Sequence, residues 1–151
     1  MKAQLLSLES VDMLVDFEKK ARISEPDIFI WDFDEHTFKA DTIKSLENPL
    51  FASARCMICV ENGEVLGRLD FALLPSIGGD LRAYVDWVYV LKEHRHKGIA
   101  QFLFKEMGEY LAKLGVAEYI LLTAENDEAQ RFYKNMQGAE IVKQEVLTKT
   151  L

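Results

Sequence analysis

The segment from Tyr84 to Leu114 places a strand, a basic turn and a helix in direct succession. We expect the strand over 84–91 and the turn over Lys92-Glu93-His94-Arg95-His96-Lys97, after which Gly98 opens the helix. A helix N-terminus leaves backbone N–H groups without partners and carries partial positive charge. Gly98 has no Cβ to keep a ligand away from the backbone. The turn therefore predicts a site for a phosphate-bearing ligand.

The charge of this turn contrasts with that of the whole chain, which carries a formal net charge of -7. Lys92, Arg95 and Lys97 would reinforce the attraction of an anion, although cations near a helix start can also simply be solvated. The strand before the turn offers an edge against which an extended ligand could lie.

Three stretches of sequence together resemble a known family. Arg95-His96-Lys97-Gly98-Ile99-Ala100 fits the pattern Gln/Arg-x-x-Gly-x-Gly/Ala, and Val88-Tyr89-Val90 precedes it. Downstream, Asn126-Asp127-Glu128-Ala129-Gln130-Arg131-Phe132-Tyr133 follows an apolar stretch. The chain resembles the GCN5-related N-acetyltransferase (GNAT) family over nearly its whole length. Lys92 departs from the pattern, since many members carry proline there, and this concerns only the local shape of the turn.

The resemblance implies a mixed α/β (α+β) fold with a mostly antiparallel central sheet of about seven strands and about four flanking helices. It implies one N-acetyltransferase domain over residues 1–151. The implied reaction moves an acetyl group from acetyl-CoA to a primary amine of a small molecule or peptide, by direct attack in a ternary complex. A non-catalytic acyl-CoA-binding module is the alternative.

Composition limits the other possibilities. A chain of 151 residues fits one domain. The acidic balance argues against nucleic acid as a partner. No apolar run approaches the roughly 18 residues of a membrane span, and the N-terminus lacks a signal-peptide pattern. We therefore expect a cytoplasmic protein without a membrane partner. Apolar residues expected on the surface near the C-terminus make a homodimer plausible.

Cys56 and Cys59 have the Cys-x-x-Cys spacing of redox motifs but lie in an apolar run that predicts a strand. Residues three apart on a strand point to opposite faces, and a redox motif needs a helix N-terminus to lower the thiol pKa. We interpret them as reduced structural thiols. No His or Cys cluster supports a metal site.

Periodicity and turn residues predict the other elements. Asn62-Gly63 indicates a tight hairpin, and Gly67 indicates a bulge or a tight neighbour. With the strand over 81–91, this hairpin makes an antiparallel meander. Ser10 and Asn126 or Asp127 are expected helix caps, Pro26 ends the first helix, and Gly115 ends the helix opened by Gly98. The expected strands are Lys2–Leu8, Cys56–Glu61, Glu64–Leu74, Tyr119–Ala124 (buried on both faces), Ala139–Val142 and Gln144–Thr148, the last two as a closing hairpin. The other expected helices begin near Ser10, span Asp34–Leu46, and carry Ala129, Phe132, Tyr133 and Met136 toward the core.

The segment 25–36 alternates carboxylates with aromatic and aliphatic residues. One interpretation is a packed loop or short helix whose aromatics enter the core while its carboxylates face water. The other is an acceptor wall, in which Trp31 and Phe33 hold an apolar body and Asp32 and Glu35 hold a cation. In the resembled family this connection often lines the acceptor cleft.

The donor site implied by the resemblance uses main-chain groups. The amides of His96, Lys97, Gly98, Ile99, Ala100 and Gln101, aided by the charge of Arg95, would hold the diphosphate of coenzyme A. The strand residues Val88, Tyr89 and Val90 would pair with its pantetheine arm as an added strand. Asn126 would steady the arm, a role compatible with capping a helix.

Two residues are candidates for proton transfer. Asp86, two residues before the proposed pantetheine contact, could take the proton of the amine, or it could be an ordinary exposed carboxylate on a strand. Glu125 is the second choice. Tyr133 matches the tyrosine that in this family commonly gives a proton to the departing sulfur and contacts the coenzyme. Its alternative is a tyrosine of the core.

Overall fold

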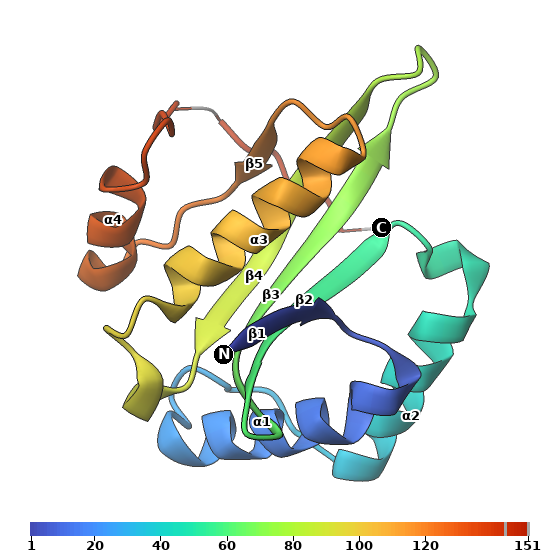
Figure 1. Cartoon of the computed structure of the whole chain (residues 1–151), viewed down its shortest axis with the longest axis vertical. Coiled ribbons are helices and arrows are strands. Elements are labelled where there is room, and N and C mark those ends of the chain that lie inside the picture. Colours follow the sequence, from blue (N-terminus) through green and yellow to red (C-terminus); the bar gives the residue numbers. More distant parts are fainter. Residues whose placement is uncertain (144, 151) are drawn as a thin grey trace. The chain divides into compact units, whose positions relative to one another are not determined.

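A five-stranded sheet is the centre of the computed structural model, which describes residues 1–143 and 145–150 (Figure 1). The chain divides into two compact units, Met1–Leu121 and Leu122–Leu151. The first unit contains the whole sheet in the order β1-β2-β3-β4-β5. Its strands are β1 (Lys2–Leu5), β2 (Ala54–Glu61), β3 (Glu64–Pro75), β4 (Leu81–Val90) and β5 (Tyr119–Leu121).

Helices connect and cover these strands. The first unit contains α1 (Val11–Ser24), α2 (Glu35–Glu47) and α3 (Ile99–Lys113), with 3-10 turns η1 (Leu8–Ser10), η2 (Pro49–Phe51) and η3 (Lys92–His94). The second unit contains α4 (Asp127–Lys134). The predicted mixed α/β class is confirmed, with five strands in place of about seven among the described residues. No helix in the described part of the chain has both the length and the apolar character needed to cross a membrane.

The antiparallel meander formed by β2, β3 and β4 is confirmed. Asn62 and Gly63 connect β2 to β3 with φ angles of 52° and 80°. Both angles are positive, as the predicted tight turn requires. By contrast, β4 and β5 are parallel, and their pairing covers only Ala83 to Val85 of β4.

Gly67 lies where β3 is pressed against the start of α3. A Cβ at this position would lie 2.9 Å from Ile99 Cγ2, 3.2 Å from Leu103 Cδ1 and 3.3 Å from Val90 Cγ2. The register between β2 and β3 also shifts here, because Cys59 pairs with Gly67 and Val60 with Val65, which leaves Leu66 of β3 without a partner on β2. Both predicted features, a tight neighbour and a bulge, are therefore present. The absent side chain lets the first turns of α3 lie close to the sheet.

The two faces of the sheet are covered by different helices. On one face, Leu14, Phe17 and Ala21 of α1 form a buried cluster with Ile58 and Tyr89. On the other face α3 packs through its buried stripe, Ile99, Leu103, Met107 and Leu111. Leu114 is exposed because α3 ends one residue before it and Gly115 follows with φ of 79°.

Cys56 and Cys59 point to opposite faces of β2, and both are free thiols. Burial raises the pKa of Cys56 well above its ordinary value and that of Cys59 to about 11. Thiols that resist ionisation are poor nucleophiles, so the structural interpretation is supported.

The C-terminal predictions need correction. The strand expected over Tyr119–Ala124 ends at Leu121, and Ile120 is 62% exposed, so it is not buried on both faces. The segments 139–143 and 145–150 contain no strand, and Gln144 lies outside the described residues. The predicted connection between these segments contains no glycine or asparagine to favour a tight hairpin turn. No side chain of α4 is buried. Of the residues predicted to face the core, Ala129, Phe132 and Tyr133 of α4 are half-exposed, as is Met136, which follows the helix.

Candidate active site

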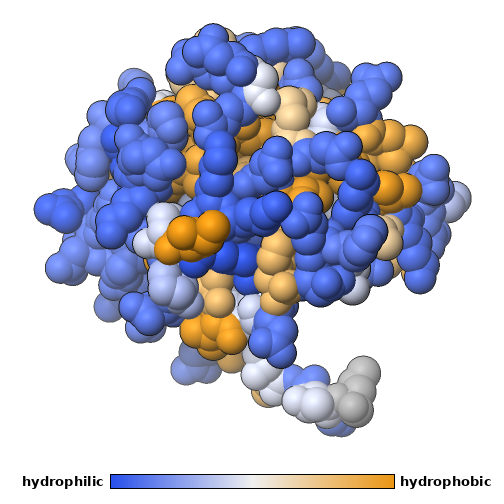
Figure 2. Space-filling view, turned by 90° about the horizontal axis from the view of Figure 1, so that it is seen from below, coloured by the Kyte–Doolittle hydropathy of each residue, from blue (hydrophilic) through white to orange (hydrophobic). Residues whose placement is uncertain are grey.

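A cavity of about 780 Å³ lies in the first unit between α1, α2 and the strands β2, β3 and β4. The segment between α1 and α2, here called the 25–34 loop, contributes part of its wall. The aromatic residues that line the cavity are Trp31, Phe33, Phe38, Phe51, Phe71 and Tyr84, and the carboxylates are Asp32, Asp34, Asp41, Asp70 and Asp86. The surface around α1 and α2 is mostly hydrophilic, with separate hydrophobic patches between the polar side chains (Figure 2).

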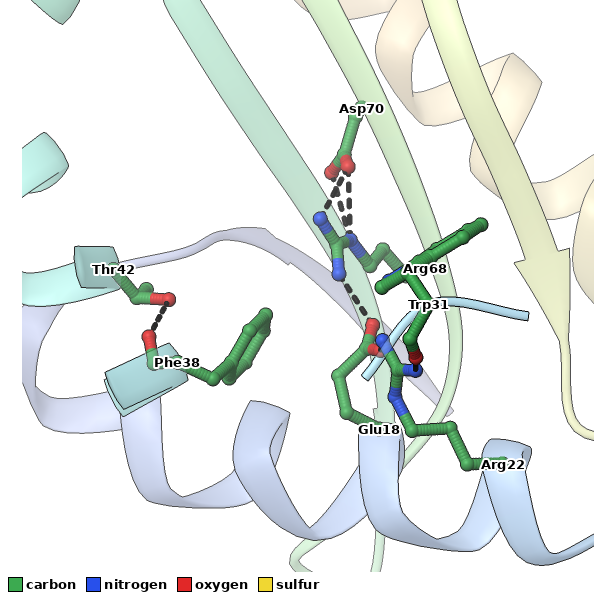
Figure 3. A network of polar contacts seen from close by, with 7 residues as sticks. All are labelled: Glu18, Arg22, Trp31, Phe38, Thr42, Arg68 and Asp70. Atoms are coloured by element: carbon green, nitrogen blue, oxygen red, sulfur yellow. Dashed lines mark hydrogen bonds and ion pairs between the residues drawn. The ribbon is translucent and has the colours of Figure 1, made fainter. Parts of the chain in front are cut away.

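A network of four charged side chains adjoins the cavity (Figure 3). Arg22, Arg68 and Asp70 line the cavity, whereas Glu18 lies behind them. The Arg68 guanidinium donates to Asp70 through Nε at 2.9 and 3.0 Å and through Nη2 at 2.5 Å, and its Nη1 binds Glu18. Glu18, only 3% exposed, also pairs with Arg22 at 3.5 Å. Two carboxylates and two guanidinium groups are neutral in sum, so burying them together avoids an uncompensated charge.

Arg22 fixes the 25–34 loop. Its guanidinium carbon lies 5.0 Å from the ring centre of Phe29, 5.4 Å from that of Trp31 and 4.5 Å from that of Phe33. Its Nη1 also donates to the Trp31 carbonyl at 3.2 Å. Cation–π contacts of a partly desolvated guanidinium each contribute roughly 0.5–2 kcal/mol. The loop therefore has a defined course without regular structure of its own.

Sequence reasoning did not identify this network. Two signals were available, since Glu18 and Arg22 are four apart on a helix, and Arg68 and Asp70 are two apart on a strand. What the sequence did not reveal is that these two pairs face each other.

The 25–34 loop combines both interpretations of its sequence. Phe29 is buried against Tyr89, with ring centres 5.1 Å apart, as expected for a packed loop. Trp31, Asp32 and Phe33 line the cavity, as expected for an acceptor wall. Glu35 does not line it and instead pairs with Lys19 at 2.8 Å.

Charge in the cavity is not fully compensated. Asp32, Asp41 and Asp86 have no hydrogen bond or ion pair with another residue in the described part of the chain. Asp34 caps α2 by accepting from Thr37 N at 2.7 Å, and hydrogen bonds from Thr37 lower the pKa of Asp34. The cavity therefore favours a cationic occupant with an apolar body.

Asp86 occupies a bulge on β4. Trp87 pairs with Asp70 and Val85 pairs with Phe71, so Asp86 between them has no partner on β3. The pairing of β4 with β5 ends at Val85. Asp86 is exposed and lines the cavity, and it directly follows the last residue of β4 that pairs with β5.

After Val85, the edge of β4 that pairs with β5 has no neighbouring strand among the described residues. Leu91 N donates to Leu66 O on β3 at 3.0 Å. Because alternate residues direct their main-chain groups to opposite sides, those of Val88 and Val90 face the open edge. Arg95 Nε already donates to Val90 O at 3.2 Å. An extended ligand would therefore find Val90 N–H and both main-chain groups of Val88.

The open edge leads into the segment here called the 95–101 turn. Gly98 precedes α3 with φ of 80°, and a Cβ built on it meets nothing within 4 Å, so the space before the helix is open. His96 also has a positive φ, 59°. Lys97 is exposed, whereas Ile99 is buried and anchors the first turn of α3. The first amides of α3, including those of Ala100 and Gln101, point toward this space.

Arg95 is engaged within the protein. Its Nη1 donates to Glu25 Oε1 at 3.1 Å, and its Nη2 binds Glu25 Oε2. Its guanidinium carbon lies 5.3 Å from the ring centre of Tyr89. The charge predicted for an incoming anion is thus already shared with a carboxylate.

The other predicted residues belong to the second unit. Asn126 caps α4 by accepting from Ala129 N at 2.8 Å, which confirms its predicted capping. Tyr133 lies on α4 with its ring 5.5 Å from that of Phe132, and burial raises the pKa of its hydroxyl. Glu125 is exposed just before the cap.

A family model matches this sequence, and solved structures share its fold. The sequence model of the acetyltransferase (GNAT) family matches residues 15–139. A ribosomal-protein-alanine N-acetyltransferase from Brucella melitensis biovar Abortus 2308 has a similar structure, with a TM-score of 0.73, 17% identity, and coverage of 99% of this chain and 100% of that one. A probable acetyltransferase has a TM-score of 0.79 and 15% identity, with coverage of 100% of this chain and 99% of that one. An aminoglycoside acetyltransferase from an uncultured soil metagenomic sample was solved in complex with sisomicin. It has a TM-score of 0.72 and 17% identity, with coverage of 99% of this chain and 96% of that one.

Proposed function

Since the chain belongs to the acetyltransferase (GNAT) family, we propose that it transfers an acetyl group from acetyl-CoA to a primary amine of a cationic small molecule or peptide, in the cytoplasm. The observation that carries the proposal is the continuity of the open β4 edge with the 95–101 turn. An extended arm ending in a diphosphate matches this strand-to-helix path, and coenzyme A has that form.

The cavity supports the choice of acceptor. Asp32, Asp41 and Asp86 would attract an ammonium group, while Trp31 and Phe33 would contact its apolar part. The solved aminoglycoside acetyltransferase in complex with sisomicin is consistent with a polycationic acceptor. Asp86 lies where this cavity meets the open edge of β4, so the amine and the acyl group would meet beside it.

Amine attack requires loss of a proton. A lysine-like amine with a pKa of about 10.4 is neutral in only about one molecule in 2,500 at pH 7, which costs about 4.6 kcal/mol. Carboxylates alone stabilise the ammonium form and oppose attack, so one of them must accept the proton directly or through water. We assign this role to Asp86, because its exposed carboxylate lacks a protein partner among the described residues.

Tyr133 is the proposed proton donor to the departing sulfur. A thiol resembles cysteine with a pKa near 8.5, against about 10 for tyrosine, so full transfer is uphill by about 2 kcal/mol. Burial raises the pKa of Tyr133 further, which favours a hydrogen bond to the sulfur over complete transfer. Attack would take place directly, with both substrates bound.

Release of free thiol from acetyl-CoA, measured with a panel of amines, tests this function. We expect cationic amines with an apolar or sugar body to accelerate release, and amines that carry a carboxylate beside the amino group to be poor acceptors. If coenzyme A binds but no amine accelerates release, the chain is a non-catalytic acyl-CoA-binding module instead.

A further inference from the structure

Glu25 joins two parts of the molecule that are far apart in sequence. It is the residue at which α1 ends and the 25–34 loop begins. Its carboxylate accepts two hydrogen bonds from Arg95, the first residue of the 95–101 turn. It also accepts from the Tyr89 hydroxyl at 2.5 Å. One carboxylate therefore connects the proposed acceptor wall, the proposed pantetheine strand and the proposed diphosphate turn.

The connection is partly shielded from water. The side chains of Glu25 and Arg95 are only 13% and 22% exposed. Bidentate contacts between a guanidinium and a carboxylate fix both partners in orientation as well as distance. Breaking such a pair leaves the other charge uncompensated, so the structure resists changes at either end.

The same guanidinium also reaches the donor strand. Arg95 Nε donates to Val90 O, on the edge of β4 where the pantetheine arm is proposed to lie. A diphosphate at the 95–101 turn would compete with Glu25 for Arg95, because two anions would then share one cation. The contact between Arg95 and Glu25 would therefore be weaker when a diphosphate occupies the turn than when the turn is empty.

We propose that Glu25 is a positioning residue that couples occupancy of the 95–101 turn to the conformation of the 25–34 loop, so that coenzyme binding adjusts the acceptor wall. This inference rests on the proposed function, since it needs coenzyme A at that turn. Coupling between two sites is reciprocal, so an amine in the cavity would change coenzyme affinity by the same factor.

Trp31 provides a direct readout of the loop. It is 54% exposed and lies against Arg22 and Phe29 within the loop. The chain has 2 tryptophans, so Trp87→Phe leaves Trp31 as the only one. In this background, coenzyme A is titrated twice, once by calorimetry for binding and once by Trp31 fluorescence for the loop.

We expect the Trp31 emission to change and to saturate with the dissociation constant that calorimetry gives. With Glu25→Gln, calorimetry should still show binding within about 3-fold, while the Trp31 response is lost. Arg95→Gln removes the other partner of the pair and should also abolish the Trp31 response. The double variant should reduce this response no further than either single variant does. Glu25→Asp, which keeps the charge, should restore part of the response.

Asp12→Asn is the matched control, because Asp12 also forms an ion pair, with Lys39 at 2.5 Å, but lies outside the cavity lining and the 95–101 turn. It should keep the full response. A Trp31 response that persists in Glu25→Gln, or that is absent from the parent while calorimetry shows binding, overturns the coupling and leaves the proposed function standing. Absence of binding in the parent overturns both.

Discussion

At the scale of single residues, the cavity separates carboxylates that serve structure from those left for a ligand. Asp70 is held by Arg68, and Asp34 caps α2. Asp86 and Asp41 have no partner among the described residues although both line the cavity. Folding leaves such carboxylates unpaired only where water or a ligand satisfies them.

Asp86→Asn should lower kcat by about 10²-fold or more, because the amide cannot accept the proton of the ammonium. The KM for acetyl-CoA should stay within about 2-fold of the parent value, since the substitution leaves unchanged the main-chain groups proposed to hold the coenzyme. Steady-state kinetics on the best amine from the panel measures both values.

Asp41→Asn serves as the comparison for that variant. It removes the same charge from the same cavity, and should raise the amine KM with little change in kcat. Equal effects of the two substitutions on kcat would show that Asp86 contributes only charge.

Sequence reasoning identified residues whose chemistry is local. The turn at Gly98, the cap at Asn126 and the position of Asp86 on a strand were predicted from a few neighbouring residues, and the structure has all three. Arg22 and Asp41 were missed because their role depends on which segments the fold brings to one cavity. Glu35 was included among the acceptor residues for its charge alone, and the structure pairs it with Lys19.

At the scale of elements, the approach of α3 to β3 sets the geometry of the donor site. Gly67 permits contact with Ile99 and Leu103, and Ile99 directly follows Gly98. The glycine in the strand thus determines how deeply the N-terminus of α3 lies against the sheet.

Gly67→Ala should lower the free energy of unfolding by about 1–3 kcal/mol, since the added methyl would lie 2.9 Å from Ile99 Cγ2. It should also weaken coenzyme binding by displacing the first turn of α3. Urea denaturation and calorimetry check the two effects. Gly108→Ala, at an open position within α3, should instead stabilise the protein by about 0.5–1 kcal/mol.

The contact between Glu25 and the 95–101 turn should fail in acid. Burial opposes ionisation of Glu25, but hydrogen bonds from Arg95 and Tyr89 outweigh it and lower the pKa of its carboxyl below 4.5. A carboxyl with a lowered folded pKa contributes stability that is fully present above its ordinary pKa and is lost as the pH falls through the folded pKa.

The difference in unfolding free energy between the parent and Glu25→Gln should therefore be largest near about pH 7 and shrink toward about pH 3. Urea denaturation at several pH values measures it. A difference that is constant over this range would contradict the assignment.

Elements defined by turn chemistry were predicted well, and those defined by long-range pairing were not. Asn62-Gly63, Pro26 and Gly115 marked their turns correctly. The strand at 119–124 and the closing hairpin were inferred from apolar composition, which does not specify a partner. In the structure β5 is short because it pairs with only three residues of β4, from Ala83 to Val85.

At the scale of the whole molecule, opposite charges are placed in two neighbouring regions of the first unit. The chain is acidic, with a net charge of -7, and its cavity carries carboxylates that have no partner in the part of the chain that the structure describes. The 95–101 turn combines lysine and arginine with a helix N-terminus. An anionic donor and a cationic acceptor would thus each be drawn to its own site.

Binding of coenzyme A at Gly98 tests the central claim most directly. Calorimetry is performed on the parent, on Gly98→Val and on Gly115→Val, a matched control at the other end of α3 with φ of 79° and equally open surroundings. Both substitutions should lower stability similarly, because a branched residue is strained at positive φ. We expect the parent and Gly115→Val to bind coenzyme A and Gly98→Val to lose binding. Equal affinity in Gly98→Val and Gly115→Val would contradict the account.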